Sequence, residues 1–161
     1  MADESKSDEP LYDYVDELND LRSGFNRTME LTFVRVTTEE VVARVPIGHQ
    51  HLQPYGLVHG GVYAGIIETV CSTGAAINAL ARGQSTVGLD NNTSFLRAVR
   101  SGTLTVTAVP LVRGRRSHVW EAKVTDDDGR VAAAGRVRLL CLEPGDVAGG
   151  EAVKLKTGTL K

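Results

Sequence analysis

The sequence predicts an α+β fold, an antiparallel sheet of about six strands wrapped around one long helix, with an extra helix near the N-terminus. The central helix is expected over residues 60–81, a segment without proline that is apolar or small on nearly every side. A helix of that kind is buried. Two alternating apolar runs precede this segment and four follow it, as strands do. Such a sheet covering one apolar helix is the expected architecture.

The N-terminal helix is expected from Pro10 to Leu21, because apolar residues recur there at a spacing of three to four. Proline suits the first turn of a helix, and Ser23-Gly24 ends the pattern. Its remaining face is acidic, which is typical of a solvated surface. Residues 1–9 are polar, and we expect them to form a disordered tail.

The first two strands are expected to form a hairpin over 30–37 and 41–47, with a turn at 37–40. In the first strand, alternation places Leu31 and Phe33 on the face opposite Val36. Residues 48–59 have no periodicity, and we expect a loop there.

Short turns join the four strands that follow the long helix, so they are expected to form an antiparallel meander. The expected strands cover 85–99, 102–113, 117–125 and 130–142. The whole arrangement is known as the hotdog fold. The predicted organisation is a tail and acidic helix at 1–25, the hotdog domain at 26–143 and a flexible tail at 144–161.

Composition limits the classes of function. The chain has 161 residues, within the ordinary size of one domain, and a net charge of −2, which argues against nucleic acid as a partner. The acidic N-terminus does not resemble a signal peptide, and no segment is apolar enough to predict a membrane span. Cys71 and Cys141 are expected to be reduced core thiols, which predicts a cytoplasmic protein.

Glu68 is the residue that most requires an explanation. A carboxylate within an apolar helix costs several kcal/mol unless it is paired, protonated or used. Glu68 therefore reaches a cavity edge, pairs with an arginine, or performs chemistry. Ser72 lies one turn later and can donate a hydrogen bond to it. Apart from Glu68, the residues on this helix face are small; they are Gly61, Ala64, Gly65, Ser72 and Ala75.

His59-Gly60-Gly61 precedes the long helix. The first N–H groups of a helix lack intrahelical partners, and glycine lets an oxygen approach them. Such a position can stabilise the oxyanion that develops on an ester or thioester carbonyl. The alternative is a tight turn into the helix. His49 and His51 lack a convincing third ligand, so we expect no metal site.

Taken together, these motifs resemble the active-site segment of hotdog acyl-CoA thioesterases. The resemblance is carried by residues 53–62, by Glu68 and Ser72, and by the segments 92–97 and 114–120. The nearest type is the phenylacetate-degradation group, which includes a 4-hydroxybenzoyl-CoA thioesterase branch. The resemblance covers about residues 26–143.

This resemblance implies specific roles. Glu68 would be the nucleophile or general base, and the Gly60 N–H would polarise the thioester carbonyl. Gln53 and His59 would position that carbonyl, and Ser72 would orient Glu68 or the water. The residues implied at the substrate are Gly61, Asn92 and Ser94, with Arg97, Arg115, Arg116 and Ser117 as candidates for the phosphates of coenzyme A. No further cofactor is expected.

Two other functions fit the same expected fold. A hydroxyacyl dehydratase or hydratase would use a histidine in a His-Phe-Pro-Gly type segment, whereas this chain reads His51-Leu52-Gln53-Pro54. A non-catalytic acyl-CoA binding protein would keep the arginines without needing Glu68.

The expected helix also predicts a homodimer with shared active sites. Gly60 and Glu68 would be about 12 Å apart along one helix axis, too far to act on one carbonyl. Two antiparallel helices would bring Gly60 of one chain to Glu68 of the other. The resemblance agrees with this pairing, and we expect these dimers to associate into a homotetramer.

Overall fold

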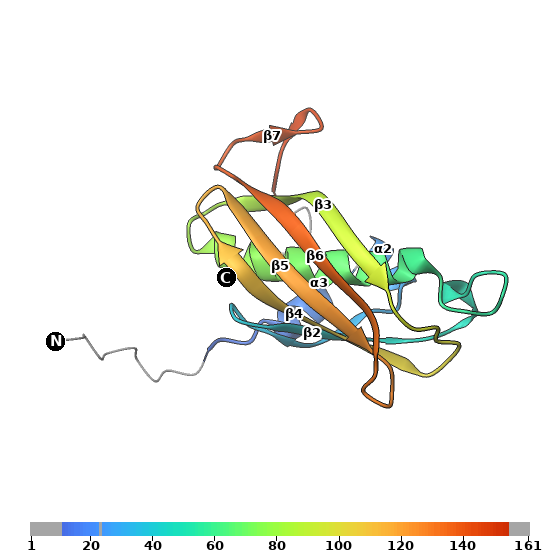
Figure 1. The fold of residues 1–161 in the computed structure, drawn as a ribbon. Helices are drawn as coiled ribbons and strands as arrows, with labels where there is room; N and C mark the ends of the chain where they lie inside the picture. The colour runs from blue at the N-terminus through green and yellow to red at the C-terminus, as the bar shows by residue number, and fades with distance from the viewer. Residues whose placement is uncertain (1–10, 23, 155–161) are drawn as a thin grey trace.

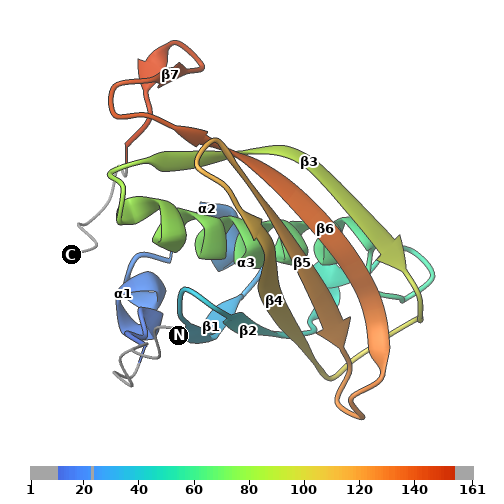
Figure 2. The ribbon, with the colours of Figure 1, turned by 60° about the vertical axis from the view of Figure 1, so that its left-hand side comes forward.

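A computed structural model of the chain describes residues 11–22 and 24–154. One long helix, α3 (Gly60–Leu80), lies against a six-stranded antiparallel sheet that curves around it (Figures 1 and 2). This architecture confirms the predicted hotdog fold. The strands of the sheet are β1 (Thr32–Val36), β2 (Val41–Pro46), β3 (Ser85–Phe95), β4 (Thr103–Arg113), β5 (Ser117–Thr125) and β6 (Val131–Leu142). The shorter elements are α1 (Val15–Asp20), α2 (Gly24–Thr28), the 3₁₀ turn η1 (His49–His51), β7 (Val147–Ala148) and β8 (Glu151–Ala152).

The long helix is held by apolar packing on its sheet-facing side, where Ile66, Ile67 and Val70 are fully buried. Gly74 lies against the buried Trp120 ring of β5, so closely that a Cβ at this position would lie 2.5 Å from the ring. The absence of a side chain at residue 74 therefore sets how near the helix comes to the sheet. None of the helices among the described residues combines the length and hydropathy that crossing a bilayer requires.

The order of the strands is β1-β2-β4-β5-β6-β3. Strands β4, β5 and β6 form the predicted meander, but β3 does not join it, because β3 pairs with β6 at the far edge. The connection 96–102 explains the difference. It is longer than a tight hairpin turn, and its first two N–H groups, of Leu96 and Arg97, donate to the Ala132 carbonyl of β6.

The predicted faces of β1 were partly wrong. Phe33 and Val36 are both buried, whereas Val34 is exposed. A β-bulge between Phe33 and Arg35 inserts one unpaired residue, which turns the rest of the strand over. The apolar Val36 therefore lies in the core, whereas strict alternation would have placed it on the opposite face of the strand.

The N-terminal helix is shorter than predicted. Pro10 lies outside the described residues, and α1 begins only at Val15. Asp13 explains the late start, because its Oδ1 accepts from the N–H groups of both Val15 and Val36, at 3.1 and 2.8 Å. A second helix, α2, was not predicted, and the expected domain division between residues 25 and 26 falls inside it.

The segment around α1 covers the outer edge of β1. Asn19 Nδ2 donates to the Phe33 carbonyl, and the Phe33 N–H donates to Asn19 Oδ1, both at 2.9 Å. Arg22 donates to the Leu31 carbonyl in the same way. An uncovered edge strand is a template for association with another chain, and here side chains remove that template. At the opposite edge of the sheet, no described segment pairs with the outer side of β3.

The C-terminal region is more ordered than the predicted flexible tail. Strands β7 and β8 form a small hairpin within residues 144–154. Val153 follows β8. Ser85 of β3 holds it against the sheet by donating to the Val153 carbonyl at 3.3 Å. Residues 155–161 lie outside the described residues.

We expect Asn19→Ala to lower the free energy of unfolding by about 1–3 kcal/mol, because it leaves one N–H and one carbonyl of the buried Phe33 without partners. Chemical denaturation would measure the change. Asp20→Ala, at an exposed neighbouring position, is the matched control and should change stability by less than about 0.5 kcal/mol. Equal stability of Asn19→Ala and wild type would contradict the edge-covering role.

Candidate active site

Glu68 lies on the flank of α3 that faces β3 and is half-buried there. Its Oε1 accepts from Ser72 Oγ at 3.1 Å, and its Oε2 accepts from Asn91 Nδ2 at 2.9 Å. No described lysine, arginine or histidine forms an ion pair with it. The alternative that Glu68 is neutralised by an arginine of the described chain is therefore excluded. Two neutral donors hold the carboxylate and leave its charge uncompensated.

Asn91 is fixed on both sides of its amide. Thr93 Oγ1 donates to Asn91 Oδ1 at 2.6 Å, so the amide nitrogen has to face the helix. That nitrogen donates to the Ala64 carbonyl at 3.1 Å as well as to Glu68. A short chain of hydrogen bonds thus runs from β3 to the carboxylate and determines where it points.

The shape of β3 makes room for this contact. A side chain at Gly88 would place its Cβ 2.7 Å from Glu68 Oε1, so any larger residue here would push the carboxylate out of its present position. A bulge between Gly88 and Asp90 then shifts the strand by one residue. Without the bulge, the face that carries Gly88 would continue at even-numbered positions. With the bulge, that face continues at Asn91 and Thr93.

The bulge decides which predicted residues reach Glu68. Asn92 lies on the outer side of the sheet, where it lines a shallow hollow with Glu121 and Arg136. Ser94 is exposed. The structure therefore brings Asn91 and Thr93 to the carboxylate rather than Asn92 and Ser94, whose role toward a substrate stays a prediction.

The start of α3 leaves the Gly60 N–H unused within the described chain. His59 caps the helix, because its Nδ1 accepts from the Gly61 N–H at 2.8 Å. The Gly60 N–H has no acceptor among the described residues. The Phe95 ring covers Gly60 so closely that a Cβ at this position would lie 2.8 Å from it. Of the three predicted groups, Gly60 offers the free N–H, His59 orders the turn, and the Gly61 N–H is already engaged.

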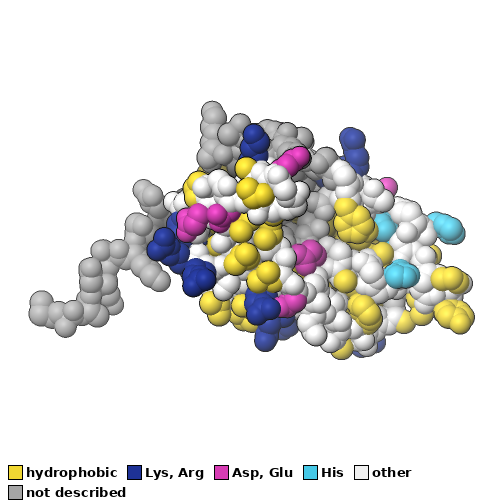
Figure 3. Space-filling view, turned by 90° about the horizontal axis from the view of Figure 1, so that it is seen from above, with side chains coloured by type: hydrophobic (Ala, Val, Ile, Leu, Met, Phe, Trp, Pro, Cys, Tyr) yellow, Lys and Arg dark blue, Asp and Glu magenta, His cyan; other side chains and the backbone are white. Residues whose placement is uncertain are grey.

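A cavity of about 360 Å³ opens beside Gly60. Gln53, Gly60, Phe95 and Arg97 line it, so the structure brings the predicted site residues Gln53, Gly60 and Arg97 together at this end of α3. Gln53 Oε1 accepts from the Tyr55 N–H at 2.7 Å, which orients the side-chain amide. Histidine side chains also gather at one end of the face seen in Figure 3.

Arg115, Arg116 and Ser117 lie at the opposite end of the long helix, in the turn between β4 and β5 and the start of β5 (Figure 1). Gln84, which follows α3, donates to the Arg115 carbonyl at 3.2 Å. The Arg115 guanidinium is 3.6 Å from the Glu143 carboxylate. Within one chain these arginines are therefore not brought to Arg97.

His51, His118 and Cys71 are buried, and their surroundings indicate structural roles. His51 is buried, with Nε2 3.1 Å from the Met29 carbonyl and Nδ1 accepting from the Gly48 N–H at 3.0 Å. Burial, with the charge of nearby Arg82, lowers the pKa of His118. Burial, with the charge of Glu68, raises the pKa of the Cys71 thiol, so this neighbour of Glu68 stays protonated. Across residues 11–22 and 24–154, no group of three or more metal-ligating side chains is assembled.

Comparison with known proteins identifies the family. Residues 55–133 match the model of the thioesterase superfamily. The Mycobacterium tuberculosis protein named "Putative esterase Rv1847" is 41% identical over 121 residues, which cover 74% of this chain and 86% of that protein.

Two solved structures extend the comparison. Thioesterase HI1161 from Haemophilus influenzae has a TM-score of 0.75 and 29% identity, covering 80% of this chain and 90% of that one. A variant of the thioesterase SAV0944 from Staphylococcus aureus has a TM-score of 0.72 and 26% identity, covering 75% of this chain and all of that one.

The chain belongs to the thioesterase superfamily. Its relatives, together with a carboxylate held by neutral donors, support a hydrolase that acts on thioesters.

We expect Asn91→Ala to lower kcat/KM for thioester hydrolysis about 10- to 100-fold, because Glu68 loses one of its two donors. Asp90→Ala is the matched control, since this neighbouring side chain forms only an exposed ion pair with Arg138 and should change the rate less than about twofold. Thermal melts should confirm that both variants are folded. Wild-type kinetics in folded Asn91→Ala would show that Asn91 does not position the carboxylate.

Proposed function

We propose that the chain is an acyl-CoA thioesterase, which hydrolyses a thioester to a free acid and coenzyme A. The observation that carries this proposal is the Glu68 carboxylate, held by Ser72 and Asn91 without any described cation. A charge kept in this way at the edge of a core is available as a base or a nucleophile.

Two routes for Glu68 remain open. As a general base, Glu68 removes a proton from a water whose oxygen attacks the thioester carbon. As a nucleophile, Glu68 attacks that carbon itself and forms an anhydride, which water then hydrolyses. In both routes the C–S bond breaks, the thiolate of coenzyme A leaves and takes up a proton, and the Gly60 N–H stabilises the oxyanion.

The active site that we propose needs two chains. Eight positions along α3 separate Gly60 from Glu68, which is about 12 Å of helix. Asn91 and Gly88 place the carboxylate sideways against β3, so it does not reach toward the start of its own helix. We therefore assign the oxyanion donor for this carboxylate to the Gly60 of another chain.

The two sheet edges support this pairing. Asn19 covers the outer edge of β1, whereas no described segment covers β3, which is the strand that holds Glu68 in place. A second copy added along β3 would set two α3 helices side by side and antiparallel, with two equal sites. The association of such dimers into a homotetramer and the cytoplasmic location stay predictions.

The comparison with SAV0944 supports the choice of residues. Two structures of that protein carry alanine in place of a glutamine and in place of a glutamate, fifteen positions apart in its sequence. Gln53 and Glu68 have the same separation here.

Coenzyme A is proposed as the leaving group because Arg97 lines the cavity beside Gly60. The planar guanidinium group suits phosphate. A phosphate role for Arg115, Arg116 and Ser117 stays a prediction, since in one chain they lie at the other end of α3.

We expect Glu68→Gln to lower kcat on the order of 10² or more, because the amide is neither a base nor a nucleophile. A thiol reagent would follow release of free coenzyme A from a panel of acyl-CoA substrates. Thiol release also separates hydrolysis from hydration or mere binding, neither of which liberates a thiol. Glu39→Gln, on an exposed turn, is the matched control. A folded Glu68→Gln protein with near-wild-type turnover would refute the assignment.

A further inference from the structure

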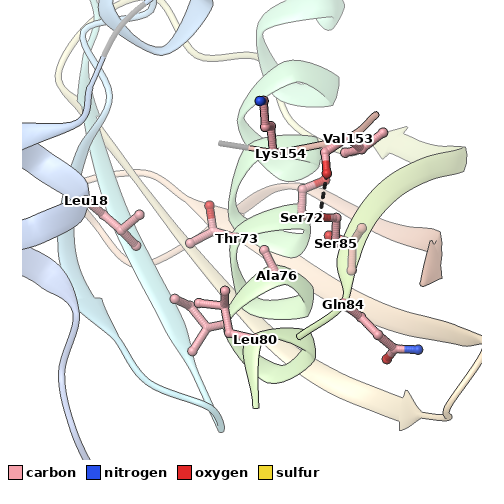
Figure 4. A pocket seen from close by; sticks show the side chains of 11 residues that line it. Leu18, Ser72, Thr73, Ala76, Leu80, Gln84, Ser85, Val153 and Lys154 are labelled. Atoms are coloured by element: carbon pink, nitrogen blue, oxygen red, sulfur yellow. Dashed lines mark hydrogen bonds between the residues drawn. The ribbon is translucent and has the colours of Figure 1, made fainter. Parts of the chain in front are cut away.

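A second cavity, of about 320 Å³, follows the C-terminal half of α3. That volume is at the lower end of the range for small-molecule sites. Figure 4 shows Ser72, Thr73, Ala76 and Leu80 along the helix, with Leu18 of α1 on one side and Val153 on the other. Most of the surface between these residues is apolar. We call this cavity the α1–α3 pocket.

The α1–α3 pocket adjoins the proposed active site. Ser72 lines it and also donates to Glu68 Oε1. From β3, Thr86 lines it, and Thr86 lies on the same strand face as Gly88, against which the Glu68 carboxylate rests. One end of the pocket is therefore a direct neighbour of the carboxylate, and its apolar part extends from there toward Leu80.

The two cavities differ in chemistry. The cavity beside Gly60 contains Gln53 and Arg97, which suit the polar and phosphorylated part of a thioester. Beyond Ser72, the α1–α3 pocket offers Ala76, Leu80 and Leu18, which suit a hydrocarbon. The thioester C–S bond has to lie at Glu68, because hydrolysis separates the acyl group from the thiol there.

We propose that the α1–α3 pocket binds the acyl chain, and that the substrates are thioesters of unbranched aliphatic acids of medium length. This inference rests on the proposed function. From Ser72 to Leu80 the helix extends about 12 Å, which fits an extended chain of roughly nine carbons.

The walls of this pocket come from the ends of the chain. Leu18 and Val153 both lie outside the residues 55–133 that match the superfamily model. Val153 is held by the hydrogen bond from Ser85 to its carbonyl and by its own N–H, which donates to the Asp146 carbonyl at 3.2 Å. These terminal segments therefore flank an acyl chain that lies along α3 in the pocket.

The test compares straight-chain acyl-CoA substrates from acetyl to dodecanoyl. Each methylene buried in the pocket should raise kcat/KM roughly three- to fourfold, until the pocket is full. Ala76→Leu fills the pocket and should lower the ratio of octanoyl to acetyl kcat/KM at least tenfold. Leu18→Ala removes an apolar side wall and should lower the ratio of octanoyl to acetyl kcat/KM, because the acyl chain loses that contact. Ala148→Leu, on β7 outside the pocket, is the matched control and should keep the wild-type ratio.

Each outcome has a distinct meaning. No release of thiol from any acyl-CoA by wild type would refute the proposed function itself. Glu68-dependent hydrolysis with no preference for chain length would refute the acyl assignment alone. An equal loss for acetyl and octanoyl substrates in Ala76→Leu would show that the coenzyme A arm, and not the acyl chain, occupies the pocket. If Ala76→Leu fails to fold, an unchanged length profile in Leu18→Ala would overturn the proposal.

Discussion

The Glu68 carboxylate accepts hydrogen bonds from Ser72 and Asn91 and pairs with no described cation, so its charge acts on whatever enters the gap between α3 and β3. Other features of the fold serve this arrangement. Gly88 leaves the space that the carboxylate occupies, and the adjacent bulge turns Asn91 toward the helix. Loss of the bulge or of Asn91 would leave the half-buried carboxylate with Ser72 as its one described side-chain donor.

The position of this carboxylate also explains how the two edges of the sheet differ. Side chains around α1 cover the edge at β1, whereas the edge at β3, beside Glu68, is uncovered in the described chain. An edge left open next to an incomplete site is consistent with completion by a second copy. The terminal segments therefore have two effects in this account. They block association at the β1 edge, and they form two walls of the α1–α3 pocket, in which we place the acyl chain of the substrate.

Local sequence patterns predicted much of this structure. The long apolar helix, the hairpin turns that join β1 to β2, β4 to β5 and β5 to β6, and the contact from Ser72 to Glu68 depend on residues close in sequence, and all are present. The pairing of β3 with β6 joins distant segments, so alternation could not reveal it. Asn91 was missed because a bulge reverses the faces of β3, although glycine at position 88 was a signal that something approaches the strand closely. The pocket walls were missed because Leu18 and Val153, which are far apart in sequence, come to the two sides of α3 only in the folded chain.

The central claim is that Glu68 of one chain and Gly60 of another act on the same thioester. Subunit complementation tests it most directly. Glu68→Ala and a Gly60→Val variant, each inactive alone, would be unfolded together and refolded as a mixture. The account predicts that activity returns, because a mixed dimer has one site with both lesions and one intact site. Mixed dimers that form but remain inactive, or an active monomer, would contradict it.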